Sequence, residues 1–508
     1  MNNAIIKSME KKHLLFLFIL IFWNISIVNG QENTLNLRVD DNLVLYQLKG
    51  GIGASWHSLV KDIPLENEKY DYPVRFNNPR GSAFAGNPPL SDTVAWKQLY
   101  RHARWLGLNF LRVELSQRIY EPEQNVFDWE NEEMQVLYRI LDWCEANHAD
   151  VFLQQMWGDV AWNAFPGVHP LLSAPKSLDD YANGITALLE HLTLTKKYSC
   201  IKYFSITNEP PGGTWGYWWC YGSGSGSVTP AWKAVRETLD AKNINIPLSG
   251  PDWTSLPPFD TAKIDFDKYI GAYDIHSYGG IDNEGEVILS DWSRWAHEHK
   301  KPFFLSEFGN MNLGWGTDNP GPKSFEAALS NANDVIRGLN MGVDGFNRWS
   351  FTNRGDIDGQ WQLVRTYDTE KKEYTADVTP EKEAYYGFAV ISRFLGKYAS
   401  VVHWQTDWCI EGVKPAAFKN RDGNLVILIV NKKKKAVKLN LTLLGSLGQK
   451  PYQFYQITKE MVTSPSFRLD PQKTITGLNK QKTLELLPGS ITVLTTYNLK
   501  HNDLGIME

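Results

Sequence analysis

Hydrophobic and polar positions along the middle of the chain predict strands and helices in alternation. Short apolar runs typical of buried parallel strands recur from about residue 50 to about residue 350. They lie at 50–56, 109–114, 151–156, 201–207, 246–250, 272–276, 303–306 and 345–350. Amphipathic segments separate many of them. The clearest is 325–339, where apolar residues recur at three- and four-residue steps. Eight such strands predict a (β/α)8 barrel over residues 48–395.

Helix-start signals support this alternation. Ser91 is a plausible N-cap for a helix over 92–106, and Ser177-Leu178-Asp179-Asp180 resembles a capping box. Thr379-Pro380 predicts the start of the final helix, with the threonine as N-cap and the proline in the first turn. A doubly wound sheet is the alternative α/β fold. It would usually carry a Gly-rich phosphate loop after an early strand, and the sequence has none in that context.

After residue 396 the pattern changes to strands alone. Residues 425–430 form a continuous apolar strand after the turn signal Asp422-Gly423, and 437–440 and 490–497 are also strand-like. We therefore expect a small β-sandwich domain over 396–498. The strand-like segment within 31–47 is expected to join that sandwich, and residues 499–508 are expected to form a frayed tail.

The N-terminus has the pattern of a secretory signal. Lys11 and Lys12 precede an apolar run from Leu14 to Trp23, which is too short to span a bilayer. Val28-Asn29-Gly30 offers a plausible cleavage site. Residues 1–30 are thus predicted to be a signal peptide that sends the protein to the periplasm or outside the cell, with no membrane span after cleavage. The alternative is an uncleaved anchor.

Composition narrows the possible partners. The 508-residue chain has a net charge of -5 and no basic stripe, so no nucleic-acid partner is expected. Its 20 tryptophans suit a carbohydrate ligand, because sugar C–H faces stack on indole rings. The four cysteines form no C-x-x-C pair, and no metal or other cofactor is expected. A serine esterase is disfavoured because the G-x-S-x-G motif is absent.

Two acidic residues follow apolar strands of the predicted barrel. Glu209 comes after Ile206-Thr207-Asn208 in the fourth strand region, and Glu307 comes after Phe304-Leu305-Ser306 in the seventh. Barrel enzymes act at the C-terminal ends of their strands, so the two carboxyl groups can face each other over the barrel mouth. Retaining glycoside hydrolysis needs such a pair, one protonated and one ionised, about 5–5.5 Å apart.

With these motifs the chain resembles the clan of retaining (β/α)8 glycoside hydrolases that includes families 5, 30 and 39. Its members carry an Asn-Glu pair after the fourth strand and a Glu after the seventh. The resemblance covers about residues 48–395 and implies that Glu209 is the general acid/base and Glu307 the nucleophile.

The resemblance also implies roles for neighbouring polar residues. Arg112 resembles the arginine beside the nucleophile, although a salt bridge with Glu114 is an alternative role. Asn208 resembles the amide that binds the sugar 2-hydroxyl. In His276-Ser277-Tyr278, the tyrosine would orient Glu307 and the histidine would line the central sugar subsite.

Three tryptophans complete the predicted substrate site. Trp349 resembles the tryptophan that forms the floor under the central sugar. Trp56 and Trp157 lie near predicted strand ends, where they can stack on sugars, although most tryptophans in proteins belong to the core.

One difference from the clan pattern bears on which family of the clan the chain resembles. Family 5 members often carry a histidine near the end of the third strand, where this chain has Gln155-Met156-Trp157. The glycine-rich first strand, the strand before it and the trailing β-sandwich look more like family 30 or 39.

The sequence therefore predicts a hydrolase that cleaves β-glycosidic bonds in an oligo- or polysaccharide by double displacement. A transglycosylase using the same site is one alternative, since only the acceptor differs. A non-catalytic carbohydrate-binding protein on the same fold is another. The presence of both Glu209 and Glu307 argues against it.

Overall fold

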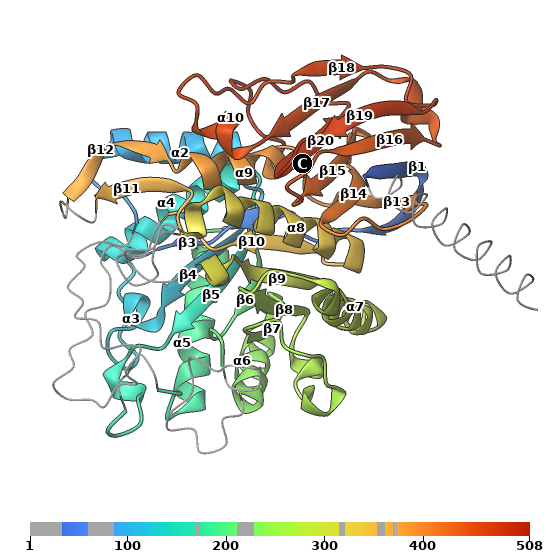
Figure 1. Ribbon diagram of the computed structural model, residues 1–508. Coiled ribbons are helices and arrows are strands. Elements are labelled where there is room, and N and C mark those ends of the chain that lie inside the picture. Colours follow the sequence, from blue (N-terminus) through green and yellow to red (C-terminus); the bar gives the residue numbers. More distant parts are fainter. Residues whose placement is uncertain are drawn as a thin grey trace, which may run out of the picture.

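The computed structural model describes residues 33–58, 86–168, 170, 173–210, 228–313, 321–352, 361–368, 371 and 373–508. Its centre is a closed ring of parallel strands surrounded by helices, with a β domain packed on one flank (Figure 1). This is the predicted barrel with a C-terminal β domain. The predicted signal peptide, residues 1–30, lies outside the described residues. Within the described ranges, no helix is both long and apolar enough to cross a bilayer.

The ring has eight positions because its first strand is made of two short pieces. The first piece pairs with the last strand and the second piece pairs with the second strand, and Ser55 separates them. In chain order the strands are β2 (Ile52–Ala54), β3 (Trp56–His57), β4 (Phe110–Ser116), β5 (Asp150–Trp157), β6 (Ile201–Ser205), β7 (Leu248–Trp253), β8 (Ala272–Ser277), β9 (Phe303–Phe308) and β10 (Gly345–Arg348).

Helices cover the outside of this ring. They are α2 (Thr93–Leu106), α3 (Gln117–Tyr120), α4 (Glu132–Ala146), α5 (Leu178–Glu190), α6 (Thr229–Ala241), α7 (Asn283–Glu298), α8 (Phe325–Met341) and α9 (Lys382–Ser392). Ser177 caps α5 as predicted, since its side chain accepts a hydrogen bond from the backbone N–H of Asp180. The prediction that Ser91 caps α2 is wrong: Asp92 does so, by accepting from the backbone N–H of Ala95.

The prediction that Thr379-Pro380 opens the last helix is also wrong. These residues end the strand β12 (Glu373–Pro380), which forms an antiparallel hairpin with β11 (Val364–Asp368). The helix α9 starts at Lys382, with Glu381 at its N-cap. Proline suits an edge strand as well as a first helical turn, so the dipeptide alone could not decide between them.

Inside the barrel, side chains alternate along each strand between the ring interior and the helices. Phe110, Phe152, Ala272 and Phe304 form a cluster of their own with Tyr203 packed against it. Their neighbours in sequence, such as Leu111 and Leu305, belong to the large core shared with the helices. Two residues further along the strands, the interior becomes polar, and this change positions the site described below.

The β domain is one nine-stranded sheet in which the N-terminal strand takes part. The strand β1 (Thr34–Gln47) lies between β13 (Ser400–Thr406), to which it is antiparallel, and β16 (Val437–Leu443), to which it is parallel. The other strands are β14 (Val413–Lys419), β15 (Leu425–Asn431), β17 (Tyr452–Ile457), β18 (Lys473–Ile475), β19 (Lys482–Leu486) and β20 (Ser490–Thr495), with a short helix α10 (Lys459–Thr463).

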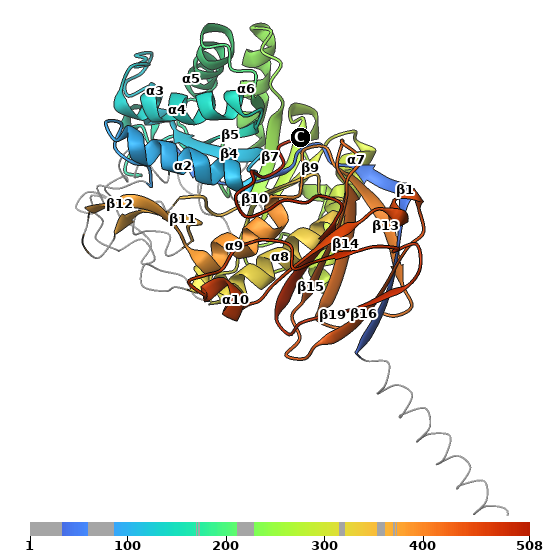
Figure 2. The same cartoon turned by 90° about the horizontal axis from the view of Figure 1, so that it is seen from above.

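Both faces of this sheet are apolar where it meets the barrel. Ile427 and Ile429 of β15 point into the domain's own core, whereas Val426 and Leu428 belong to the barrel's core cluster. Figure 2 shows β14 and β15 beside α8. The continuous apolar run of β15 is therefore explained by burial on both faces.

The C-terminal residues do not fray, which corrects the prediction for 499–508. Met507 is buried, and the backbone N–H of Ile506 donates to the carbonyl of Arg393 at 2.9 Å. The indole N–H of Trp105 donates to the carbonyl of His501 at 2.6 Å. Polar residues such as His501-Asn502-Asp503 gave the segment the composition of a tail, but these contacts fix it against α2 and α9.

Candidate active site

Glu209 lies just beyond the end of β6, at the C-terminal mouth of the barrel. Its φ of 45° is in the left-handed region, which turns the chain sharply after Asn208. Its backbone N–H donates to Oδ2 of Asp252 at 3.2 Å. Its carboxylate Oε1 lies 2.8 Å from Nδ1 of His276. The residue is 7% exposed, so the carboxyl group is largely removed from water.

Glu307 lies within β9, three ring positions away. It forms an ion pair with the guanidinium of Arg112 and accepts a hydrogen bond from the hydroxyl of Tyr278. Its Oε2 is also 3.3 Å from Nδ1 of His276. A register shift in the pairing of β8 with β9 places Glu307 opposite His276, directly after Ser306. Ser306 and Glu307 are adjacent in sequence, and because of this shift both contact polar groups of β8.

The two carboxyl groups are close together. Glu209, His276 and Glu307 each contribute one ligand-type atom, and the three atoms lie within 4.8 Å of one another. Carboxyl groups of retaining glycosidases are about 5–5.5 Å apart, whereas those of inverting enzymes stand about 6.5–9.5 Å apart to leave room for a water. The observed separation therefore matches the retaining geometry.

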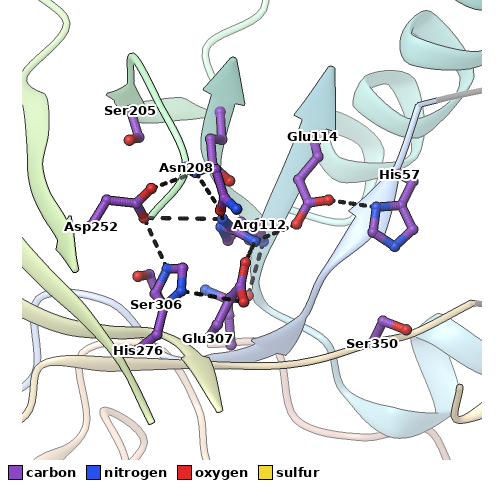
Figure 3. Close-up of polar contacts among 12 residues, drawn as sticks. His57, Arg112, Glu114, Ser205, Asn208, Asp252, His276, Ser306, Glu307 and Ser350 are labelled. Atoms are coloured by element: carbon purple, nitrogen blue, oxygen red, sulfur yellow. Dashed lines mark hydrogen bonds and ion pairs between the residues drawn. The ribbon is translucent and has the colours of Figure 1, made fainter. Parts of the chain in front are cut away.

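Figure 3 shows Glu307 among charged and polar residues, with Arg112 and His276 beside it. Burial alone would lower the pKa of Arg112, but the charges of Glu307, Glu114 and Asp252 outweigh burial and raise it. Burial would likewise lower the pKa of His276, yet the charges of Glu307 and Asp252 raise it well above its ordinary value. Burial raises the pKa of Glu307, and the charges of Arg112 and His276 oppose that effect.

The structure brings the predicted polar residues together. Asn208 accepts a hydrogen bond from Nη2 of Arg112 at 2.7 Å. Arg112 pairs with both Glu114 and Glu307, so the two roles considered for it coexist. Tyr278 stays a hydrogen-bond donor to Glu307, because burial and the charge of Glu307 raise the pKa of its hydroxyl well above the usual range.

The three predicted tryptophans have different positions. The ring of Trp349 lies 5.9 Å from Cζ of Arg112 and packs edge-on against His57, so it borders the site. Trp157 ends β5, but its side chain lies outside the described part of the structure.

The prediction that Trp56 binds substrate is wrong. Its side chain is fully buried against Tyr100 of α2 and Trp143 of α4, and its indole N–H donates to Asn87 at 2.9 Å. Strand alternation explains this placement, because adjacent residues face opposite sides of the barrel wall. The next residue, His57, faces the site instead, with Nδ1 2.5 Å from Oε2 of Glu114.

Several buried residues at the site were not predicted. Asp252 is the last residue but one of β7 and lies 2.9 Å from Nε2 of His276, and Gln154 donates to it at 2.9 Å. Asp274 lies deeper, where Ser249 and Ser306 donate to its two oxygens, each at 2.7 Å. The signal that could have found Asp252 was available. It is an acidic residue at a strand end, as Glu209 and Glu307 are.

Two groups here have the composition of a metal site, namely Glu209–His276–Glu307 and Asp252–Asp274–His276. Both rely on His276, which must be neutral to bind a metal. The charges around His276 favour its protonated form instead. The arrangement suits proton transfer, and we assign no metal to it.

Comparison with known proteins identifies the chain. The sequence model for cellulase, glycosyl hydrolase family 5, matches residues 69–336, just over half of the 508 residues. The chain belongs to glycosyl hydrolase family 5. It is thus a glycoside hydrolase of the clan that the two strand-end glutamates indicated.

Solved structures resemble the whole fold of this family 5 hydrolase. A family 30 subfamily 8 xylanase from Clostridium acetobutylicum shares 15% identity, with a TM-score of 0.60 over 91% of this chain and 99% of its own. An endo-β1,6-glucanase shares 14% identity, with a TM-score of 0.58 over 91% of this chain and 94% of its own. A glucosidase from Croceicoccus marinus shares 11%, with a TM-score of 0.57 over 91% and 98%.

These comparisons bear on the choice between families. The absence of a histidine after the third strand counted against family 5, and the first strand, the strand before it and the β-sandwich looked more like family 30 or 39. The matching sequence model is that of family 5. The fold, including the trailing β domain, is similar to that of the family 30 xylanase. No curated protein matches the sequence.

Proposed function

We propose that this glycoside hydrolase cleaves β-glycosidic bonds in an oligo- or polysaccharide with retention of configuration, with Glu307 as nucleophile and Glu209 as general acid/base. One observation carries the proposal: atoms of the two carboxyl groups lie within 4.8 Å of each other. That spacing fits one sugar carbon between the two groups and leaves no room for the attacking water of an inverting reaction.

The proposed reaction has two steps. Glu209 protonates the glycosidic oxygen while Glu307 attacks the anomeric carbon, which gives a covalent glycosyl-enzyme and releases the leaving sugar. The ester bond removes the negative charge of Glu307, so the repulsion between the two carboxylates disappears. Glu209, which gave its proton to the leaving oxygen in the first step, now takes a proton from water. The water oxygen attacks the anomeric carbon as its bond to Glu307 breaks, which regenerates both carboxyl groups.

The residues around the nucleophile support its role. Arg112 and Tyr278 both contact Glu307, so they hold the carboxylate in place and favour its ionised form. Asn208 is held by Arg112 beside the acid/base, where an amide can bind the sugar 2-hydroxyl. Trp349 borders the same space and offers its ring to the apolar face of a sugar.

The names of the structural neighbours support a proposal for the substrate class. One is named as a xylanase, one as an endo-β1,6-glucanase and one as a glucosidase. We therefore propose a neutral β-linked glucan or xylan as substrate, to be identified by a screen of aryl β-glycosides and polysaccharides. We also propose export by the signal peptide 1–30. Sequencing the N-terminus of the mature protein tests this, and Gln31 is the expected first residue.

Azide rescue tests the two catalytic assignments. Glu307→Gly should lose turnover of an activated aryl β-glycoside, and added azide should restore it with an α-glycosyl azide as product. Glu209→Ala with azide should instead give the β-glycosyl azide. Glu298→Ala, at an exposed position on α7, is the matched control and should behave like the wild type. Full activity of Glu307→Gly without azide would exclude the mechanism.

A further inference from the structure

Asp252 lies under the catalytic pair and is fully buried. Its Oδ1 is 2.9 Å from Nε2 of His276. Its Oδ2 accepts hydrogen bonds from the amide of Gln154 at 2.9 Å and from the backbone N–H of Glu209 at 3.2 Å. Figure 3 shows this carboxylate facing His276, on the opposite side of Arg112 from Glu114. Asp252 thus contacts Glu209 by two routes, one direct and one through His276.

The position of Asp252 determines what His276 can do. A carboxylate facing Nε2 requires a hydrogen on that nitrogen. The other nitrogen, Nδ1, faces oxygens of Glu209 at 2.8 Å and of Glu307 at 3.3 Å. An imidazole donates from both nitrogens only when it is protonated. The charges of Glu307 and Asp252 favour that state and raise the pKa of His276 despite its burial.

The charges that face His276 come from three other elements. Glu209 follows β6, Asp252 belongs to β7 and Glu307 belongs to β9. Arg112 of β4 reaches Glu307 directly, and its Nη2 lies 4.0 Å from Oδ1 of Asp252. On β8 itself, Tyr278 donates to Glu307.

Asp274, also on β8, does not add a second charge beneath His276 near neutral pH. Burial and the charge of Asp252 raise the pKa of Asp274 to about 8, so Asp274 stays protonated and shares a hydrogen bond with Asp252. The carboxyl group that faces Nε2 of His276 is that of Asp252.

We propose that Asp252 is a positioning residue for the acid/base step: it holds His276 as a donor to Glu209 and fixes the backbone from which the Glu209 carboxyl projects. The proposal rests on the roles proposed above for Glu209 and Glu307. It assigns no contact with substrate to Asp252 itself.

The contacts explain why Asp252 acts on the acid/base more than on the nucleophile. Glu307 is held by Arg112 and Tyr278 as well as by His276. The hydrogen bond that the described residues give to the Glu209 carboxyl comes from His276. Without the Asp252 charge, Glu307 keeps two donors, while Glu209 loses both the orientation of its carboxyl and the anchor of its backbone.

The test compares leaving groups, because only a poor leaving group needs protonation. For Asp252→Asn, kcat/KM should fall by about 10²-fold on phenyl β-glycosides but by less than about tenfold on 2,4-dinitrophenyl β-glycosides. The matched control is Glu114→Gln, which alters the carboxylate that pairs with Arg112 on the nucleophile side. It should lower kcat/KM by the same factor for both leaving groups. Equal losses for Asp252→Asn on both substrates would overturn the proposal.

Two further variants keep the result interpretable. Glu209→Ala must show the strong leaving-group dependence. If the loss in Glu209→Ala does not depend on the leaving group, the proposed function has failed. If the loss depends on the leaving group in Glu209→Ala but not in Asp252→Asn, only the role of Asp252 is excluded. If Asp252→Asn does not fold, His276→Gln breaks the same link from the other side. The same selective loss is expected for it, and a uniform loss would count against the proposal.

Discussion

The two ends of the barrel interior are built by the same strands and have opposite chemistry. At the N-terminal end, Phe110, Phe152 and Phe304 pack with Ala272 into a dry cluster. Two or three residues further along the same strands, the interior holds buried ions, among them Arg112 and Glu307. In β4 the change takes only two residues, from Phe110 to Arg112, and in β8 the series runs from Ala272 through Asp274 to His276.

The difference between the apolar and the charged end shows how one fold combines stability with a reactive site. Apolar burial at one end contributes stability in proportion to the area removed from water. Buried charges at the other end cost free energy to desolvate, and they persist because each is paired. In return they supply fixed charges in a water-poor site, which is where electrostatic catalysis is strongest. We expect substitutions at the two ends to affect different measurements.

The largest effect is expected from Glu307→Gln, which keeps the shape and removes the charge. Turnover should fall by about 10⁵-fold or more, because the nucleophile is lost. The free energy of unfolding near neutral pH should stay equal or rise, because burial disfavours the ionised carboxyl and raises its pKa. Steady-state kinetics and urea unfolding on the same preparation check both. A large loss of stability with activity retained would contradict the assignment of catalysis, and not stability, to this end of the barrel.

Phe304→Ala, three residues earlier in β9, should give the opposite result. Removing a fully buried phenylalanine is expected to lower the free energy of unfolding by about 3–5 kcal/mol. The site above is held by its own ion pairs, so kcat at a temperature where the variant is folded should change by less than about tenfold. A kinetic defect as large as that of a catalytic variant would show that the two ends are not independent.

The effect expected from Asp274→Asn, in the layer between the two ends, is on how the free energy of unfolding depends on pH. The pKa of Asp274 is raised from 3.8 to about 8, so between these pH values the folded chain holds a proton that the unfolded chain releases. The proton bound by Asp274 therefore stabilises the folded state fully at low pH. As pH rises towards 8, the free energy of unfolding falls by about 1 kcal/mol per pH unit. Asn should remove that slope. The difference in unfolding free energy between wild type and variant, measured from pH 5 to 8, tests this, and parallel curves would contradict it.

The sequence was sufficient to predict the barrel and its two glutamates for a simple reason. Apolar runs marked the strands, and an acidic residue at the end of a strand has few reasons to be there other than chemistry. The same rule applied to Asp252 but was not used, because the predicted fifth strand ended at residue 250, two residues before it. Asp274 lies inside a strand, where a sequence alone does not reveal that two serines satisfy its carboxyl group.

The errors at Trp56 and at the C-terminal segment concern features that the local sequence pattern does not determine. Trp56 and His57 are adjacent in β3, and which of them faces the barrel interior depends on the strand's register in the ring. The polar end of the chain looked like a tail because its partners are distant in sequence: Arg104 is 401 residues from Gly505, and Arg393 is 107 residues from Lys500. Tertiary contacts of this range are not encoded in any window of the sequence.

The central claim, that Glu209 and Glu307 flank one sugar closely enough for a double displacement, is tested most directly by the configuration of the product. Proton NMR of the first turnovers on a cleavable β-glycoside observes the anomeric signals before mutarotation mixes them. The account predicts that the β-anomer appears first and the α-anomer only later. Initial formation of the α-anomer would contradict it, because inversion requires a water between carboxyl groups that lie further apart.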